Sequence, residues 1–150
     1  MANSVCKVLV TEAALQNFAV NDGDASAGAI VDFRGVVRKL EDQRAIDGID
    51  YEAHRVMAEH QMRLIADAAA EKFELTEVLL HHRIGFVRAG EVSLFLRVRA
   101  RHRGAAFDAS KWIVDELKKK VPIWKRVRFS PSRTGVKQNG GMKKETVSAQ

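Results

Sequence analysis

The stretch EVSLFLRVRAR at residues 91–101 decides the fold of this chain. Its apolar side chains alternate with the others, and a period of two is typical of a strand that buries one face. Between Ala105 and Lys119 the apolar spacing changes to three and four residues, the period of an amphipathic helix. A long strand that leads into a long helix predicts a sheet with a helix packed on it. The inward face of the strand is expected to consist of Val92, Leu94, Leu96, Val98 and Ala100.

Outward from this unit, the same patterns predict the rest of the fold. Helical spacing predicts a long helix at 57–73, in which Met57, Leu64 and Ile65 face the core. The order of elements predicts an α+β fold with a mostly antiparallel sheet and packed helices. Alternation predicts the remaining strands at residues 5–10, 28–38, 46–54 and 77–83.

The segments between these strands carry two further expectations. Thr11 has a side chain that caps helices well, so a short helix is expected at residues 11–19. The charged stretch from Lys39 to Arg44 is expected to be mobile. Neither segment shows the periodicity that supports the longer elements.

Length and composition favour one domain in a reducing compartment. We expect a single α+β domain over residues 1–128 and a polar, basic, flexible tail over 129–150. Cys6 is the only cysteine, so it has no partner for an internal disulfide. No apolar run reaches the ~18 residues of a membrane span, and no secretory signal is visible. A cytoplasmic protein is therefore expected.

Positive charge gathers in the last third of the chain. Residues 101–150 hold 13 Lys and Arg against 4 Asp and Glu, whereas residues 1–100 are slightly acidic. Pro122 ends the second long helix, which places Lys118 on its last turn and Lys125 on an extended segment. Crowded cations bind anions and make a lysine amine a better base or nucleophile. The alternative is a solvated helix end that complements the helix dipole.

A candidate anion site joins these lysines to cations from two other places. Arg38 closes a predicted strand beside a loop, and His102 with Arg103 follows the strand at 91–101. Arginine holds an oxyanion with two parallel N–H groups, while lysine adds a movable charge. The candidate set is Arg38, His102, Arg103, Lys118 and Lys125.

Two other groups are weaker candidates. His81 and His82 are neighbours on a predicted strand, so their side chains face opposite ways and cannot chelate one metal. No metal site is expected, because a real one needs several convergent ligands. Tyr51-Glu52 is the other group, in which Glu52 is either an acid/base group or the ion-pair partner of an arginine.

Together, these segments resemble the large, catalytic subunit of molybdopterin synthase. Residues 28–38 match that family's strand GA-apolar-V-x-F-x-G-x-VR, and residues 51–59 match YEAY..MAE. The family's HRIG....GE appears at residues 82–91. The series is completed by His102-Arg103, Ala106-Phe107, Leu117-Lys118 and Pro122-Ile123-Trp124-Lys125.

The resemblance implies an α/β hammerhead fold and a sulfurtransferase. Such an enzyme converts cyclic pyranopterin monophosphate to molybdopterin by inserting two sulfurs as a dithiolene, and no cofactor beyond that substrate is implied. The sulfur comes from a small ubiquitin-like partner whose C-terminal Gly-Gly carries a thiocarboxylate. Two large subunits form the homodimeric core of a heterotetramer. The resemblance gives Lys118 and Lys125 catalytic roles and gives Arg38, His102 and Arg103 substrate-binding roles.

Two other functions stay open from the sequence. The basic last third, with Trp112, Trp124 and Phe129 as stacking groups, also suits a small nucleic-acid-binding domain. A paralogue that binds the small subunit without chemistry would carry the same motifs. Retention of both lysines favours the enzyme.

Overall fold

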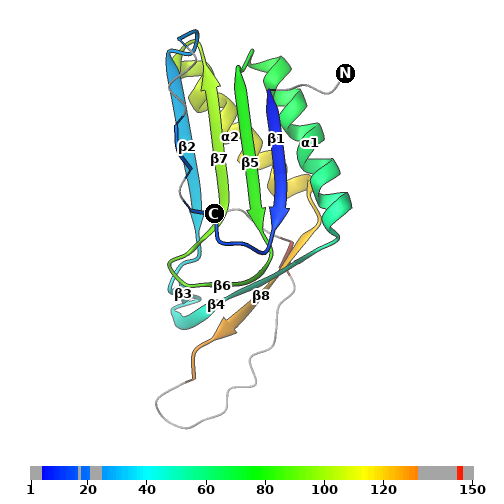
Figure 1. The fold of residues 1–150 in the computed structure, drawn as a ribbon. Coiled ribbons are helices and arrows are strands. Elements are labelled where there is room, and N and C mark those ends of the chain that lie inside the picture. The colour runs from blue at the N-terminus through cyan, green and yellow to red at the C-terminus, as the bar shows by residue number, and fades with distance from the viewer. Residues whose placement is uncertain (1–4, 17, 21–24, 132–144, 147–150) are drawn as a thin grey trace.

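The structure, a computed structural model, describes residues 5–16, 18–20, 25–131 and 145–146. Its larger sheet is built from β1 (Cys6–Thr11), β2 (Ala29–Val36), β5 (Glu77–Arg83) and β7 (Val92–Ala100). The strand order is β1-β5-β7-β2, in which only β1 and β5 run parallel. Two helices cover one face of this sheet (Figure 1), and they are α1 (Arg55–Lys72) and α2 (Arg103–Lys120).

A second sheet crosses the lower end of the first (Figure 1). It is called the smaller sheet because most of its strands are short. It consists of β3 (Leu40–Glu41), β4 (Arg44–Ala53), β6 (Gly85–Arg88), β8 (Ile123–Phe129) and β9 (Glu145–Thr146). Its order is β3-β4-β8-β9, with β6 paired to β4, and all its pairs are antiparallel. The α+β class and the predominance of antiparallel pairing are thus confirmed, with the strands divided between two sheets.

The strands and the two long helices expected from periodicity are present, but the helix expected at 11–19 is wrong. None of the described residues in that range is helical, and Thr11 instead accepts a hydrogen bond from the backbone of Ala13. The guanidinium of Arg97 donates to the carbonyl oxygens of Phe18 and Ala19 at 3.0 and 2.7 Å. An extended segment leaves those carbonyls available, whereas a helix would use them internally.

The charged stretch at 39–44, expected to be mobile, forms a tight hairpin instead. β3 pairs with the start of β4, and the connecting residues Asp42 and Gln43 have positive φ values of 49° and 64°. Two consecutive left-handed residues make the mirror-image turn whose twist suits a hairpin. The turn therefore places Glu41 beside the strands of the smaller sheet.

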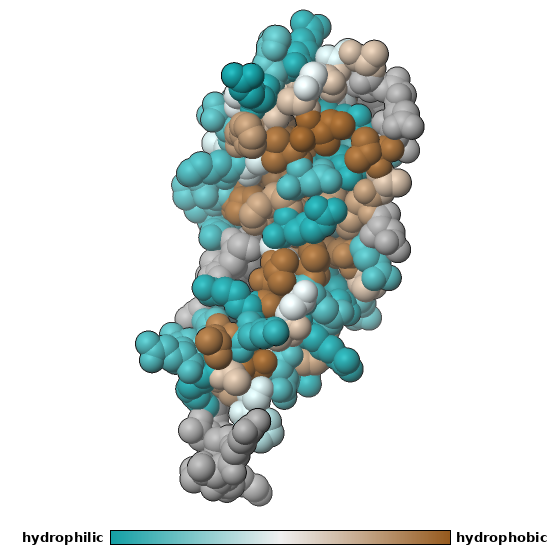
Figure 2. Space-filling model, turned by 90° about the vertical axis from the view of Figure 1, so that its left-hand side faces the viewer, coloured by the Kyte–Doolittle hydropathy of each residue, from teal (hydrophilic) through white to brown (hydrophobic). Residues whose placement is uncertain are grey.

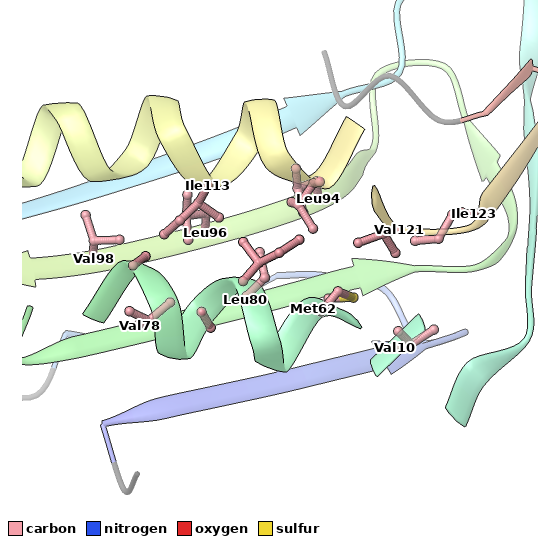
Figure 3. Packing of buried hydrophobic residues seen from close by; sticks show 14 of the residues in the cluster. Val10, Met62, Val78, Leu80, Leu94, Leu96, Val98, Ile113, Val121 and Ile123 are labelled. Atoms are coloured by element: carbon pink, nitrogen blue, oxygen red, sulfur yellow. The ribbon is translucent and has the colours of Figure 1, made fainter. Parts of the chain in front are cut away.

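Figure 3 shows the core, which lies between the larger sheet and the two helices. Met62 and Ile113 from the helices pack against Leu80 and Leu96 of the sheet, and all four are almost fully buried. The stripe expected on α1 is only partly correct, because Met57 and Leu64 are about half exposed. The buried stripe consists of Ala58, Met62, Ile65, Ala66, Ala69 and Ala70. Its alanines are small, so the helix packs closely.

Both faces of β7 are buried, although the sequence predicts only one. The expected face packs on the helices, and Phe95, Arg97 and Arg99 are buried on the other. Phe18 stacks on Phe95 with ring centroids 3.7 Å apart, so the segment before β2 covers this side of the sheet. The alternating pattern gives no sign of this cover because arginines stand on the covered face.

Candidate functional site

A small cavity lies where the end of β2, the hairpin and the strands of the smaller sheet meet. Its volume is about 20 Å³, which is room for roughly one water molecule. It is too narrow for a fused ring system, so only the end of a thin group fits inside. Its lining residues are Val36, Val37, Arg38, Glu41, Ile46, Ile49, Tyr51, Ser93 and Lys125.

Lys125 is the buried cation of this cavity. It lies on β8 directly opposite Tyr51 of β4, so both side chains stand on the same face of the smaller sheet. Only 5% of Lys125 is exposed. A charge with little water around it interacts strongly with any anion that approaches, because screening is weak there. The extended segment after Pro122 is thus confirmed as the strand that carries Lys125.

Arg38 is the second cation of the cavity, and it is open to solvent. The register of β2 against β7 shifts between Gly35 and Val36, which marks a bulge. The bulge bends the strand just before Arg38 and so influences where that residue lies. Its side chain is 60% exposed and lies 3.9 Å from the carboxylate of Glu41. Glu41 is the only carboxylate among the lining residues described for this cavity. Among the residues that the structure describes, the cavity therefore has one cation inside, one at its mouth and one resident anion.

Hydroxyl groups form another side of the cavity. The Ser93 hydroxyl donates to the carbonyl oxygen of Gly35 at 3.3 Å, and Tyr51 is hydrogen-bonded to Ser93. Burial raises the pKa of Tyr51, the hydrogen bond with Ser93 opposes this, and the charge of Glu41 raises it further. Tyr51 is therefore a neutral phenol at ordinary pH.

His82 stands behind Tyr51. The two rings meet edge to face with centroids 5.3 Å apart. The Nδ1 atom of His82 lies 2.7 Å from the carbonyl oxygen of Arg83, so it carries the proton and donates. Burial lowers the pKa of His82 to about 4, which keeps its ring neutral. The predicted opposition of His81 and His82 is confirmed, since His81 contacts Phe18 on the other side of the sheet.

The other three candidate residues do not line this cavity. Lys118 is exposed on the last turn of α2, and His102 and Arg103 are exposed at its first turn. Fifteen residues of helix separate Arg103 from Lys118, a rise of roughly 22 Å. Within one chain, the structure brings Arg38 and Lys125 together and leaves His102 and Arg103 at the far end of α2.

The start of α2 is nevertheless favourable for an anion. His102 is the N-cap residue and makes no side-chain capping hydrogen bond, and the first turn contains no acidic residue. Arg103 adds a positive charge where the helix dipole is already positive, which costs stability unless an anion is bound. No acidic side chain of the first turn therefore offsets the positive charge at the start of α2.

Two polar residues of the cavity, Glu41 and Ser93, were not singled out by sequence reasoning, and Tyr51 was named only as the neighbour of Glu52. Glu52, the acid/base candidate, is exposed and lies beside Trp124 and Arg126, outside the cavity. Because side chains alternate along a strand, the burial of Tyr51 and the exposure of Glu52 follow from one another. The spacing of Ile49 and Tyr51, two large residues two positions apart on a predicted strand, was the sequence feature that indicated an inward-facing Tyr51.

The described part of the chain shows neither a metal cluster nor a membrane helix. No three His, Cys, Asp or Glu residues of that part converge as a ligand set. In the same residues, no helix has the length and apolar character needed to span a bilayer.

The fold and the site define an α+β protein that offers anions a narrow, cation-bearing cavity at the junction of two sheets. The family described as "MoaE protein" matches residues 7–120. The chain belongs to this family.

Known relatives agree with this assignment. The molybdopterin synthase catalytic subunit of Pyrococcus abyssi is 43% identical over 102 residues, covering 68% of this chain and 69% of the relative. The crystal structure of molybdopterin synthase from Staphylococcus aureus is 28% identical, with a TM-score of 0.73, and the match covers 82% of this chain and 91% of that one. A complex of subunits 1 and 2 of the molybdopterin-converting factor from Helicobacter pylori shares the fold, at 19% identity and a TM-score of 0.62, with 87% and 92% covered.

Proposed function

We propose that this chain is the catalytic subunit of a molybdopterin synthase. It is a sulfurtransferase that converts cyclic pyranopterin monophosphate to molybdopterin, with sulfur from the C-terminal thiocarboxylate of a small ubiquitin-like subunit. The observation that carries the proposal is Lys125, a buried cation that shares a narrow cavity with Arg38 in a chain of this family. No cofactor of its own enters the reaction, and the protein works in the cytoplasm.

The shape of the cavity assigns the two anionic reactants to different places. A terminal glycine with its thiocarboxylate is thin, so its end fits beside Lys125, whereas a pterin must lie outside at the mouth. The fixed ammonium stabilises the negative charge that develops when the thiocarboxylate sulfur bonds to a carbon of the pterin side chain and the oxygen substituent there leaves. Water then cleaves the acyl–sulfur bond, which leaves the sulfur on the pterin and a carboxylate on the small subunit. Arg38 at the mouth suits the substrate phosphate because its guanidinium matches an oxyanion. Lys118, exposed on the last turn of α2, takes the second catalytic role.

The small subunit is the expected partner because the Helicobacter pylori structure holds two different subunits of the converting factor. A C-terminal Gly-Gly has no side chains, so its backbone can approach the mouth closely and place only its terminal atoms in the cavity of about 20 Å³, where bulkier residues would clash. The partner's last two residues are therefore essential to the proposal.

A second copy of the chain is the other expected partner. β2 is one of the two outer strands of the larger sheet in the described residues, and Ile30 and Val36 on it are 41% and 43% exposed. Figure 2 shows this side of the molecule, where hydrophobic side chains gather between hydrophilic ones. An uncovered strand of this kind favours pairing with another strand.

Antiparallel pairing of β2 with β2 of a second copy would also complete the site. Ala29 at the start of β2 pairs with Ala100, just before the first turn of α2, and the other end of β2 leads to Arg38. In a two-fold antiparallel pair the start of one strand faces the end of the other. His102 and Arg103 of one copy then approach Arg38 and Lys125 of the other.

The nucleic-acid alternative loses part of its support. Trp112 is half-buried and packs against Phe73, with ring centroids 6.0 Å apart, so it is not free to stack on a base. Among the three proposed stacking groups, only Trp124 is exposed, at 45%, whereas Trp112 and Phe129 are partly buried.

The proposal is tested by mixing three purified components: this protein, a thiocarboxylated small subunit and cyclic pyranopterin monophosphate. Molybdopterin should form, and it should form equally after treatment with a chelator, since no metal takes part. A small subunit that lacks its last two glycines should give no product. Full activity with that truncated partner would contradict the proposed sulfur source.

A further inference from the structure

We propose that Tyr51 and Ser93 are positioning residues, which fix the side chain of Lys125 relative to Arg38. The inference rests on the proposed function. The three side chains come from three strands: Tyr51 from β4, Ser93 from β7 and Lys125 from β8. All of them are buried and line the same cavity.

The first step is the connection between the two sheets. The Ser93 hydroxyl donates to the carbonyl oxygen of Gly35 at 3.3 Å, and Tyr51 is hydrogen-bonded to Ser93. Gly35 lies at the bulge of β2, three residues before Arg38. Ser93 therefore connects the strand beside Lys125 to the bulge before Arg38, since its hydroxyl bonds to Gly35 and interacts with the side chain of Tyr51. Inside a protein such bonds are strong because water does not compete for them.

The second step is the contact between Tyr51 and Lys125. The two residues are directly opposite in the β4–β8 ladder, so their Cβ atoms are about 5 Å apart. A lysine side chain has many rotamers, so its amine has a defined position only when neighbouring groups restrict the aliphatic part of the side chain. Side chains at opposite ladder positions stand next to each other on one face, so Tyr51 limits the room available to that aliphatic part, and Ser93 interacts with the Tyr51 hydroxyl.

The third step is the support on the other side of the ring. His82 contacts Tyr51 edge to face at 5.3 Å, and it is itself 2% exposed. Its Nδ1–H group is bonded to the carbonyl of Arg83, which fixes the imidazole plane. Since His82 stays neutral at ordinary pH, it adds no positive charge near Lys125. Tyr51 is thus held at both its ring and its hydroxyl.

These contacts define positioning rather than proton transfer. The raised pKa of Tyr51 keeps its hydroxyl protonated across ordinary pH, and that hydroxyl is already bonded to Ser93. Removing the Tyr51 hydroxyl should therefore change the position of the Lys125 amine and leave the acid–base chemistry of the reaction unchanged. The expected result is a lower kcat and a pH dependence of kcat whose shape is unchanged.

The kinetic test uses Tyr51→Phe and Ser93→Ala, each of which deletes one hydroxyl. Ser110→Ala is the matched control, because Ser110 is also a buried serine whose hydroxyl donates to a backbone carbonyl, that of Ala106, within α2. With the small subunit present, we expect kcat to fall about tenfold in the first two variants, while KM for the pterin stays within about twofold. The control should turn over like the parent.

A second measurement does not depend on activity. Brief treatment with acetic anhydride followed by mass spectrometry gives the extent of acetylation at each lysine. In Tyr51→Phe and Ser93→Ala the buried Lys125 should react severalfold faster relative to the exposed Lys119, and in Ser110→Ala the ratio should not change.

The outcomes separate the two proposals. Unchanged kcat and unchanged acetylation in Tyr51→Phe and Ser93→Ala would overturn the positioning role. An equal loss of kcat in Ser110→Ala would overturn it too, since the effect would then be general. If the parent forms no molybdopterin but the acetylation pattern is as expected, the proposed function fails and the positioning of Lys125 stands.

Discussion

The two ends of α2 carry similar cations in different surroundings. Beyond its C-terminal end, Lys125 is 5% exposed and lies in a cavity whose walls come from two sheets. At its N-terminal end, His102 and Arg103 are exposed and do not line that cavity. Sequence reasoning placed all of these residues in one site, whereas one chain holds them at opposite ends of the helix.

The difference shows what each end can contribute. A buried, positioned ammonium acts strongly on a charge that develops within a reaction, because the group is already oriented and poorly screened. Exposed cations at a helix N-terminus attract an anion from solution and hold it loosely. We therefore assign chemistry to the cavity and substrate capture to the start of α2, and the predictions below test that division.

The largest expected effect is at Lys125. Lys125→Met keeps the length of the side chain and removes its charge, so single-turnover formation of molybdopterin should fall by roughly a hundredfold or more. Methionine is the better substitution because Lys125 is buried. Lys118→Ala should lose a smaller part of the activity.

Lys119 and Lys120 serve as controls for Lys125. Both are exposed on the last turn of α2, so alanine at either position should leave turnover near the parental rate and change stability by less than about 0.5 kcal/mol. Circular dichroism verifies the fold of each variant. Parental turnover by a folded, partner-bound Lys125→Met protein would remove the cavity from the mechanism.

The next prediction compares His82 with His102 in their effect on the pH dependence of stability. The pKa of His82 is about 4 in the folded protein and 6.5 as the ordinary value, so between these values the unfolded chain binds a proton that the native chain does not. Stability should therefore be intact above pH 6.5 and should decline as the pH falls toward 4, by up to about 3 kcal/mol. Denaturant unfolding at a series of pH values measures this slope.

His82→Phe should remove most of that slope, whereas His102→Gln, at the exposed end, should leave it unchanged. The comparison uses the slope and not the absolute stability, since His82→Phe also loses the hydrogen bond to Arg83. An equal slope in the parent and in His82→Phe would show that other groups govern acid stability.

A smaller effect is expected at the mouth of the cavity. Arg38→Ala should weaken binding of the pterin substrate about tenfold to a hundredfold, because a charge-assisted hydrogen bond is lost. Arg38→Lys should not restore binding, since an ammonium lacks the planar pair of donors. Equilibrium binding with the pterin measures both variants, and unchanged affinity in Arg38→Ala would reject this role.

The smallest effect concerns the resident anion. Glu41 lies 3.9 Å from Arg38, and the arginine is 60% exposed, so the pair is weak. Glu41→Gln should tighten binding of the anionic substrate by no more than about fivefold. Asp115→Asn, which breaks an ion pair with Lys111 outside the cavity, is the control and should change nothing. Weaker binding by Glu41→Gln would mean that the carboxylate contacts the substrate favourably.

Much of the fold was predictable because strong periodicity reports burial directly. The strand at 91–101 and the two long helices follow from it, and Pro122 correctly separates α2 from the strand that carries Lys125. The segment after Thr11 was mispredicted because its conformation depends on Arg97 and Phe95, which are far away in sequence. A capping residue alone does not make a helix when tertiary contacts favour an extended chain.

The site was predictable in composition but not in arrangement. The residues Arg38 and Lys125 follow from motifs and from the ends of elements. The positions of Ser93 and Glu41 depend on strand register and on the hairpin turn, which the sequence does not specify by itself. Arg103 begins α2 and Lys125 lies on the strand beyond its end, so the length of the helix separates the two residues within one chain.

Mixing two inactive variants tests the central claim most directly. Lys125→Met damages the cavity and Arg103→Ala damages the start of α2, so with the pterin substrate well below saturation each protein alone should form little molybdopterin. If the two regions meet across a two-fold axis, exchange of subunits restores one intact site in each mixed dimer, and activity should return to about a quarter of the parental value. Activity in the mixture no higher than the average of the two variants would contradict a site shared between copies.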